Sequence, residues 1–222
     1  MKVLKLLCMI FILNSCNVSS YEETKIMKSK NIIEHLKNNN LEGVIEAIES
    51  GVSVNTVDTN NRSLLLLATI NKQTKIASYL VTQGANVNLQ ANNLDSAFLY
   101  AGASGQTELV ALYLLHNAKF DIYNRYYGTA LIPACERGYV DTVKLLASTP
   151  HFPINHINKL GWTALLETVI LGNGNENYQN IVKILLEHGA DINITDHNGV
   201  NVLQHAINRK QFEIVEILKK HK

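Results

Sequence analysis

Proline is scarce in this sequence, and neither sign of charge is in excess. Only 3 prolines occur among 222 residues, so no proline-rich linker divides the chain. The 20 basic residues almost balance the 19 acidic ones, without a dense run of lysine or arginine. Because nucleic-acid binding draws on a basic excess that releases counterions from phosphates, this balance argues against a nucleic-acid partner. Hydrophobic residues make up 46% of the chain, which is enough for one domain with a core.

Cysteine is scarce too. Cys8 and Cys16 fall within the first sixteen residues, and only Cys135 lies further along the chain. Two of the three thiols therefore lie at the N-terminal start, and we expect no intramolecular disulfide in a mature chain that has lost its leader. Cys135 follows an alanine in an expected helix, so we interpret it as a small buried apolar residue and not as a reactive thiol.

The longest apolar run is short and lies at the N-terminus. Lys2 and Lys5 give a positive start, and the apolar residues then continue to Leu13. A membrane-spanning helix needs about 20 apolar residues, so this run does not predict one. A basic start followed by a short apolar run is typical of a secretory signal, which we place at residues 1–15.

The segment 13–16 reads Leu-Asn-Ser-Cys and resembles the lipobox of bacterial lipoproteins. The resemblance implies that the Cys16 sulfur carries a lipid and that this residue becomes the mature N-terminus. The alternative is ordinary cleavage nearby, which leaves Cys16 free. An asparagine and not an aspartate follows, which by the lipoprotein sorting rule favours the outer membrane. Residues 16–30 are then a lipidated cysteine and a polar tether.

Self-comparison shows a repeat. Residues 181–193 read Ile-Val-Lys-Ile-Leu-Leu-Glu-His-Gly-Ala-Asp-Ile-Asn, and residues 76–88 carry a related copy. A second block, Thr-Ala-Leu in its clearest form, precedes the later copies, and its alanines Ala68, Ala101 and Ala134 are 33 residues apart. That is the period of ankyrin repeats. On these motifs, the chain from residue 31 to its end resembles the ankyrin-repeat family.

The resemblance implies an all-α solenoid of stacked helix-turn-helix units joined by β-hairpin-like loops. A single unit cannot bury its own apolar face, so the stack supplies the stability, and the terminal units act as polar caps. The expected ankyrin-repeat domain, 31–222, has about six units: 31–57, 58–90, 91–123, 124–157, 158–195 and 196–222.

Residue types at the element boundaries predict local structure. Thr129 and Thr163 stand where a first helix begins, so we expect both hydroxyls to cap free backbone N–H groups. Gly84 and Gly189 end second helices, where positive φ is needed. At the hairpin tips, where the family usually has glycine, three units carry Asn61, Leu94 and Tyr127. Leucine and tyrosine tolerate positive φ poorly, so we expect irregular hairpins there. Between the helices of unit five, residues 172–179 contain a polar insertion that predicts a loop.

The sequence offers no pattern for catalysis. It has neither a glycine-rich phosphate loop after a strand nor a Gly-x-Ser-x-Gly elbow. His151 and His156 have no third ligand nearby to complete a zinc set, so we expect exposed loop histidines. His205 occupies a first-helix slot where ankyrin repeats often have histidine, which implies hydrogen bonding within the repeat. We therefore predict neither an enzyme nor a bound metal, cofactor or small-molecule substrate.

Ankyrin repeats bind partners on the concave surface formed by their hairpins and first helices. Carrying the family's contact positions over to this sequence gives a candidate set: Arg62, Asp95, Tyr123, Arg125, Tyr126, Arg137, Lys159, Trp162, His197 and Arg209. Aromatic and arginine residues dominate interface hot spots, and here they gather in units three to five. Trp162, the only tryptophan, either contacts the partner or packs between hairpins, and we favour contact with the partner.

The resemblances together imply a protein-binding scaffold anchored to the bacterial cell envelope through Cys16 and facing the periplasm. A sharper hypothesis, by analogy with exported ankyrin lipoproteins beside secreted toxins, is an immunity protein that blocks a periplasmic toxin. Two alternatives stay open: a secreted effector that binds a host protein, and an accessory subunit of an envelope enzyme.

Overall fold

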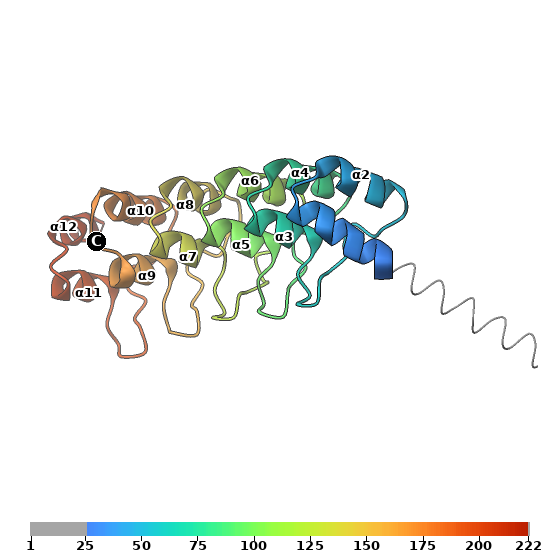
Figure 1. Ribbon diagram of the computed structural model, residues 1–222. Helices are drawn as coiled ribbons and strands as arrows, with labels where there is room; N and C mark the ends of the chain where they lie inside the picture. The colour runs from blue at the N-terminus through green and yellow to red at the C-terminus, as the bar shows by residue number, and fades with distance from the viewer. Residues whose placement is uncertain (1–25, 222) are drawn as a thin grey trace, which may run out of the picture.

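The computed structural model describes residues 26–221, and it is a stack of helix pairs (Figure 1). Residues 26–37 form the first helix. The other first helices of the units are α3 (Leu64–Ile70), α5 (Ala97–Ala103), α7 (Leu131–Glu136), α9 (Ala164–Leu171) and α11 (Val202–Asn208). The second helices are α2 (Leu41–Glu49), α4 (Thr74–Thr82), α6 (Thr107–Leu115), α8 (Val140–Ala147), α10 (Glu176–Glu187) and α12 (Phe212–Lys220).

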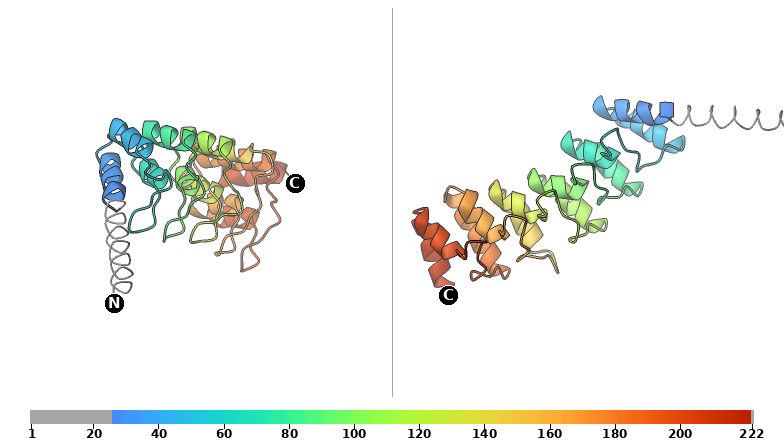
Figure 2. Two further views of the ribbon diagram at one scale, coloured as in Figure 1. Left: turned by 90° about the vertical axis from the view of Figure 1, so that its right-hand side faces the viewer. Right: turned by 90° about the horizontal axis from the view of Figure 1, so that it is seen from below.

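The helices lie in two layers. Each first helix from α3 onward packs on the next one, and each second helix from α2 onward packs on the next one. Figure 1 shows the two layers as two rows, with the hairpins projecting from the row of first helices. Figure 2 shows the pairs following one another along the stack, with the first helix and α12 at opposite ends. The expected all-α repeat solenoid is confirmed.

The core runs between the two layers along the whole stack. The leucine of the Thr-Ala-Leu block and its counterparts are buried, as Leu65, Leu131 and Leu165 show. Val182 and Leu185 of α10 are fully buried at helical spacing, as the periodicity predicts. Each unit thus buries one face within itself and the other against its neighbours, which is why the units depend on the stack.

Glutamine side chains tie successive units together. The Nε2 atoms of Gln73 and Gln106 donate to the carbonyl oxygens of Leu36 and Thr69, at 2.7 and 3.0 Å. Each of these carbonyls lies near the end of the preceding unit's first helix and also accepts a backbone N–H, from Asn39 and Lys72 respectively, so the glutamine adds a second hydrogen bond from the next unit. These bonds therefore fix how one unit sits on the next.

The hairpins are regular, so the expectation of irregular ones is wrong. Asn61, Leu94 and Tyr127 have φ of 57°, 63° and 58°, in the same left-handed region as the glycines Gly161 and Gly199 at 79° and 74°. In every hairpin the tip N–H donates to the carbonyl three residues earlier, at 2.8 to 3.0 Å. The shared hydrogen bonds impose the left-handed backbone at each tip. The non-glycine residues there adopt it at a cost in conformational strain.

The two threonines behave differently. The Thr163 hydroxyl accepts from the N–H of Leu166 at 3.2 Å and caps α9, as predicted. The prediction for Thr129 is wrong: α7 begins only at Leu131, and the buried Thr129 hydroxyl has no hydrogen-bond partner. The cause is Pro133, which lacks the N–H that would donate to the Thr129 carbonyl, as Glu167 does to Thr163 at 2.9 Å. The first turn of α7 is therefore incomplete.

Two segments expected to be irregular are partly helical. Residues 26–30, assigned above to the tether, belong to the first helix, because no glycine or proline interrupts the segment before the buried Ile32 and Leu36. Only the start of the insertion is a loop, since α10 begins at Glu176 after the Asn175 side chain caps the N–H of Asn177 at 3.0 Å. The predicted signal and Cys16 lie outside the described residues.

Candidate functional site

A hollow of about 410 Å³ lies on the hairpin and first-helix side of units three to five. It contains four of the predicted partner-binding residues: Asp95, Arg125, Tyr126 and Arg137. The rest of its lining comes from Tyr100, Ala103, Asn124, Gly128, Ile132, Pro133, Glu136, Asn158, Leu160, Glu167 and Leu171. This volume lies within the range of ligand pockets, at about 300–1,000 Å³.

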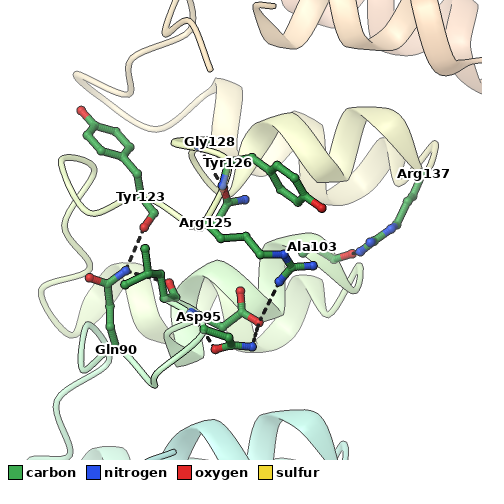
Figure 3. Close-up of polar contacts among 11 residues, drawn as sticks. Gln90, Asp95, Ala103, Tyr123, Arg125, Tyr126, Gly128 and Arg137 are labelled. Carbon is green, nitrogen blue, oxygen red and sulfur yellow. Dashed lines mark hydrogen bonds and ion pairs between the residues drawn. The ribbon is translucent and has the colours of Figure 1, made fainter. Parts of the chain in front are cut away.

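Arg125 is held at the rim by two neighbours. Its Nη1 lies 3.8 Å from Oδ2 of Asp95, and its guanidinium carbon lies 5.0 Å from the centre of the Tyr126 ring (Figure 3). The Asn93 side chain donates to the same Asp95 oxygen at 2.8 Å. Burial raises the pKa of Asp95 above its usual range, although Arg125 opposes the shift. Arg125 and Tyr126 thus present an ordered guanidinium and an exposed aromatic ring side by side.

Two further cations bridge the units. Arg137, at the end of α7, donates through Nη1 to the carbonyl of Ala103 in the preceding unit (Figure 3). The Lys159 ammonium donates to the carbonyl of Arg125 at 3.0 Å, from one hairpin to the preceding one. Lys159 therefore supports the hairpin beside the hollow without lining it.

The carboxyl group of Glu167 lies deep in the hollow, and sequence reasoning missed it. Glu167 is only 6% exposed, and its Oε2 accepts from Nδ2 of Asn158 at 3.1 Å. Burial, and then the neighbouring Glu136 carboxylate, raise the pKa of Glu167 to about 7. A signal was present, because Glu167 occupies in unit five the slot that His205 occupies in unit six.

His205 confirms the hydrogen bonding expected of that slot. Its Nε2 lies 2.8 Å from Oδ2 of Asp196, at the start of the same unit. The pair His205–Asp196 is the counterpart of Glu167–Asn158, so a side-chain bond from the first helix to the hairpin recurs in both units.

The remaining predicted residues lie outside the hollow. Arg62 is paired within unit two, with its Nη2 2.6 Å from Oδ2 of Asp58. The His197 ring covers Gly161 so closely that a Cβ there would clash. Arg209 reaches the carbonyl of Gly172 at 3.5 Å. Trp162 is half-buried and packs against the core, which favours its packing role over the expected contact with a partner.

Tyr123 belongs to an aromatic cluster away from the hollow. Its ring stacks on His156, with centres 4.4 Å apart and planes 12° apart, and lies 4.3 Å from the Tyr127 ring. His156 is thus half-buried and not the exposed loop residue expected. Figure 3 shows Tyr123 pointing away from Arg125 and Tyr126. The cluster stabilises two neighbouring hairpins and not the rim of the hollow.

The described residues show no arrangement suited to metal binding. Within residues 26–221, no group of three or more His, Cys, Asp and Glu side chains could hold a metal ion. Cys135 is fully buried, as predicted, and burial raises the pKa of its thiol, which keeps it protonated. No helix in the same part of the chain has the length and apolar character to cross a membrane.

Comparisons with known proteins agree on one architecture. The family model described as ankyrin repeats (3 copies) matches residues 32–124, 98–196 and 134–222. YahD of Escherichia coli (strain K12), which is named as an ankyrin repeat protein, is 33% identical over 76% of this chain and 84% of its own length. The crystal structure of the ankyrin repeat protein EF0377 is 39% identical, with a TM-score of 0.84 over 86% of this chain and 98% of that one. The ankyrin repeat domain ABAYE2397 from Acinetobacter baumannii AYE is 41% identical, with a TM-score of 0.81 over 86% of this chain and 96% of that one.

Proposed function

Because the chain belongs to the ankyrin-repeat family, we propose that it binds another protein through the hollow of units three to five. Ankyrin repeats indicate a protein–protein interaction scaffold. The observation that carries the proposal is the grouping of Arg125, Tyr126 and Arg137 around one concave site. Arginine and tyrosine are enriched at the centres of interfaces, where they combine large contact area with directed hydrogen bonds.

We propose that the mechanism is non-covalent recognition without catalysis. The stack holds the hollow open between three units, so a partner meets a surface that is already formed, and preorganisation lowers the entropic cost of binding. The buried, protonated thiol of Cys135 is a poor nucleophile and lies in the core.

Site-specific photocrosslinking in the producing cell tests the proposed surface. A photoreactive residue at the exposed position Tyr126 is expected to give a discrete crosslinked product, and one at the exposed position Glu187 of α10 is not. Adding Arg125→Glu should abolish the product from Tyr126 while the protein stays folded by circular dichroism. Equal products from both positions, or a product that survives Arg125→Glu, would contradict this interface.

We further propose that the protein is anchored to the bacterial envelope, facing the periplasm, by a lipid on Cys16. Support comes from the residue order alone: the basic start, the apolar run and the Leu-Asn-Ser-Cys segment. Two acyl chains or more are needed for stable anchoring, as in a lipoprotein. Cys16→Ser should move the protein from the membrane to the soluble fraction and stop the incorporation of an alkyne-labelled fatty acid.

Cys8→Ser is the matched control, because Cys8 lies in the segment that processing removes. It should leave both the membrane fraction and the labelling unchanged. Membrane association of Cys16→Ser equal to that of the unmodified sequence would refute the anchor.

Within this setting we propose that the partner is a secreted antibacterial toxin and that the protein confers immunity. A binding scaffold without catalysis, held in the periplasm, suits blockade of a toxin that arrives there. Deleting the gene should sensitise cells to a neighbouring, toxin-producing sister strain, and Arg125→Glu should fail to restore protection. A host protein or an envelope enzyme as the product crosslinked at Tyr126 would replace immunity with one of the two alternatives.

A further inference from the structure

The charges that line the hollow differ in how far the chain itself neutralises them. Arg125 faces Asp95, and Arg137 donates to the carbonyl of Ala103. In contrast, within residues 26–221 no lysine or arginine nitrogen lies within 4.0 Å of the carboxylates of Glu136 or Glu167. The two arginines of the hollow therefore have acceptors within the chain, whereas Glu136 and Glu167 have no lysine or arginine beside them among the described residues.

Glu167 is the more unusual of the two acids. It is more than nine-tenths buried, and its only side-chain hydrogen bond among the described residues goes from Asn158 to Oε2. Its other oxygen, Oε1, accepts no hydrogen bond from residues 26–221 and is not one of the enclosed polar atoms without a partner, so it stays accessible to water in the hollow. A cation that enters the hollow would replace water at this oxygen with a charge-assisted hydrogen bond.

Apolar side chains also line the hollow. Ile132 and Pro133 of α7 line the hollow, and so do Leu160 and Leu171, each 46% exposed. Exposed leucines beside a buried acid suit a side chain with an aliphatic stem and a charged head, because the stem covers the leucines and the head reaches the acid. Arginine and lysine are the side chains with this build.

We propose that the hollow receives a basic side chain of the protein partner, with its cation against the carboxylates of Glu136 and Glu167 and its stem along Leu160 and Leu171. The proposal rests on the proposed function and names the chemistry of the partner. Arginine fits better than lysine, because its planar guanidinium has five N–H donors and can bond two carboxylates at once.

Such binding has a consequence for protonation. Burial and Glu136 keep Glu167 partly protonated near neutral pH, and Glu167 in turn helps to raise the pKa of the buried Cys135 thiol. Asp95, Arg125 and Arg137 share the hollow. A bound cation favours the carboxylate form, so binding releases a proton, and affinity rises as the pH passes upward through 7.

The test uses the full-length protein and two short probes. The peptide acetyl-Gly-Gly-Arg-Gly-Gly-amide carries the proposed cation, and the same peptide with citrulline replaces the guanidinium by a neutral urea. In an NMR titration at pH 7.5, the arginine peptide should shift the amide signals of residues 132, 134–137 and 160–171, and the citrulline peptide should not. Equal shifts from both probes, or none from the arginine probe, would overturn the proposal.

Substitutions test whether Glu136 and Glu167 bind the arginine probe. Glu167→Gln and Glu136→Gln should each weaken binding of the arginine probe about tenfold, which is the loss of one charge-assisted hydrogen bond. Glu187→Gln, on the layer of second helices, should leave it unchanged. Binding of the probe should tighten between pH 5.5 and 8 for the natural sequence but not for Glu167→Gln. An affinity that is independent of pH, or insensitive to both substitutions, would overturn the proposal.

The outcome is separable from that of the proposed function. If the probe fails to bind while crosslinking at Tyr126 still depends on Arg125, the partner uses the hollow without a buried cation, and only this inference falls. If crosslinking at Tyr126 also fails, the proposed function falls with it.

Discussion

The hydroxyl oxygens of Tyr113 and Thr69 lie 2.7 Å apart, and both side chains are fully buried. Tyr113 belongs to α6 in unit three and Thr69 to α3 in unit two, so the bond crosses the boundary between two units. The Thr69 hydroxyl donates to the carbonyl of Leu65 at 2.7 Å, which leaves the Tyr113 hydroxyl as the donor between the two. The pair thus combines a large buried ring with a satisfied polar contact.

Replacing Tyr113 by phenylalanine should reduce the free energy of unfolding by about 1 kcal/mol, because it removes one buried hydrogen bond and leaves Thr69 with its bond to Leu65. Urea titration measures the change. Tyr139→Phe serves as the control, since Tyr139 is 37% exposed, and its effect should stay within about 0.5 kcal/mol. Equal losses from both substitutions would contradict a special role of the Tyr113–Thr69 contact.

The pH dependence of stability should report Glu167. Its pKa rises from 4.5 to about 7 on folding, so the unfolded chain ionises first as the pH increases. Relative to Glu167→Gln, the natural sequence should therefore lose stability between pH 4.5 and 7, on the order of 3 kcal/mol in all. Urea titrations of both proteins across this range measure the difference. If the natural sequence instead gained stability relative to Glu167→Gln as the pH rises, the raised pKa of Glu167 would be contradicted.

Because the backbone at Leu94 is left-handed, a glycine at this position should stabilise the protein. A leucine at φ of 63° is strained, and a glycine there is not, although glycine loses more entropy on folding. Leu94→Gly should therefore raise the free energy of unfolding by about 1 kcal/mol. The matched change Leu160→Gly, at an equally exposed leucine outside this region, should lower it. Thermal unfolding of both variants decides the point.

The two threonines at first-helix starts should respond in opposite ways to the loss of their hydroxyls. Thr163→Val removes the cap of α9 and should cost about 1 kcal/mol. Thr129→Val removes a buried hydroxyl without a hydrogen-bond partner and should be neutral or stabilising. Chemical denaturation of the two variants gives the comparison, and a comparable loss in both would show that Thr129 caps α7 in solution.

The sequence alone predicts the architecture well because each signal that defines the repeat lies within one unit. Apolar spacing, the alanines at a constant interval and the turn residues each act within one unit, and their agreement predicts the stack. Thr163 and His205 follow the same logic, because their partners lie in their own unit. The failure at Thr129 was avoidable in principle, since Pro133 stands in the sequence at the position whose N–H closes the first turn.

The hollow resists prediction because it forms between units. Glu136 and Glu167 are 31 residues apart, and only the stacking of unit four on unit five brings both to one cavity. The hairpins show the same limit. Propensity argues against positive φ at Leu94 and Tyr127, yet the hydrogen bonds of the hairpin impose it. Trp162 likewise packs partly on the core, a contact that its position within the unit did not predict.

The hollow takes its lining from three consecutive units, with Asp95 in the third, Arg137 in the fourth and Glu167 in the fifth. A linear stack loses order from its ends, because terminal units have a neighbour on one side only. The interior placement therefore keeps the site intact while the ends fray. It also makes the site sensitive to bending, since any change in the curvature of the stack changes the distance between residues of units three and five, such as Asp95 and Glu167. A ligand that contacts all three units would restrict this bending and stiffen the middle of the molecule.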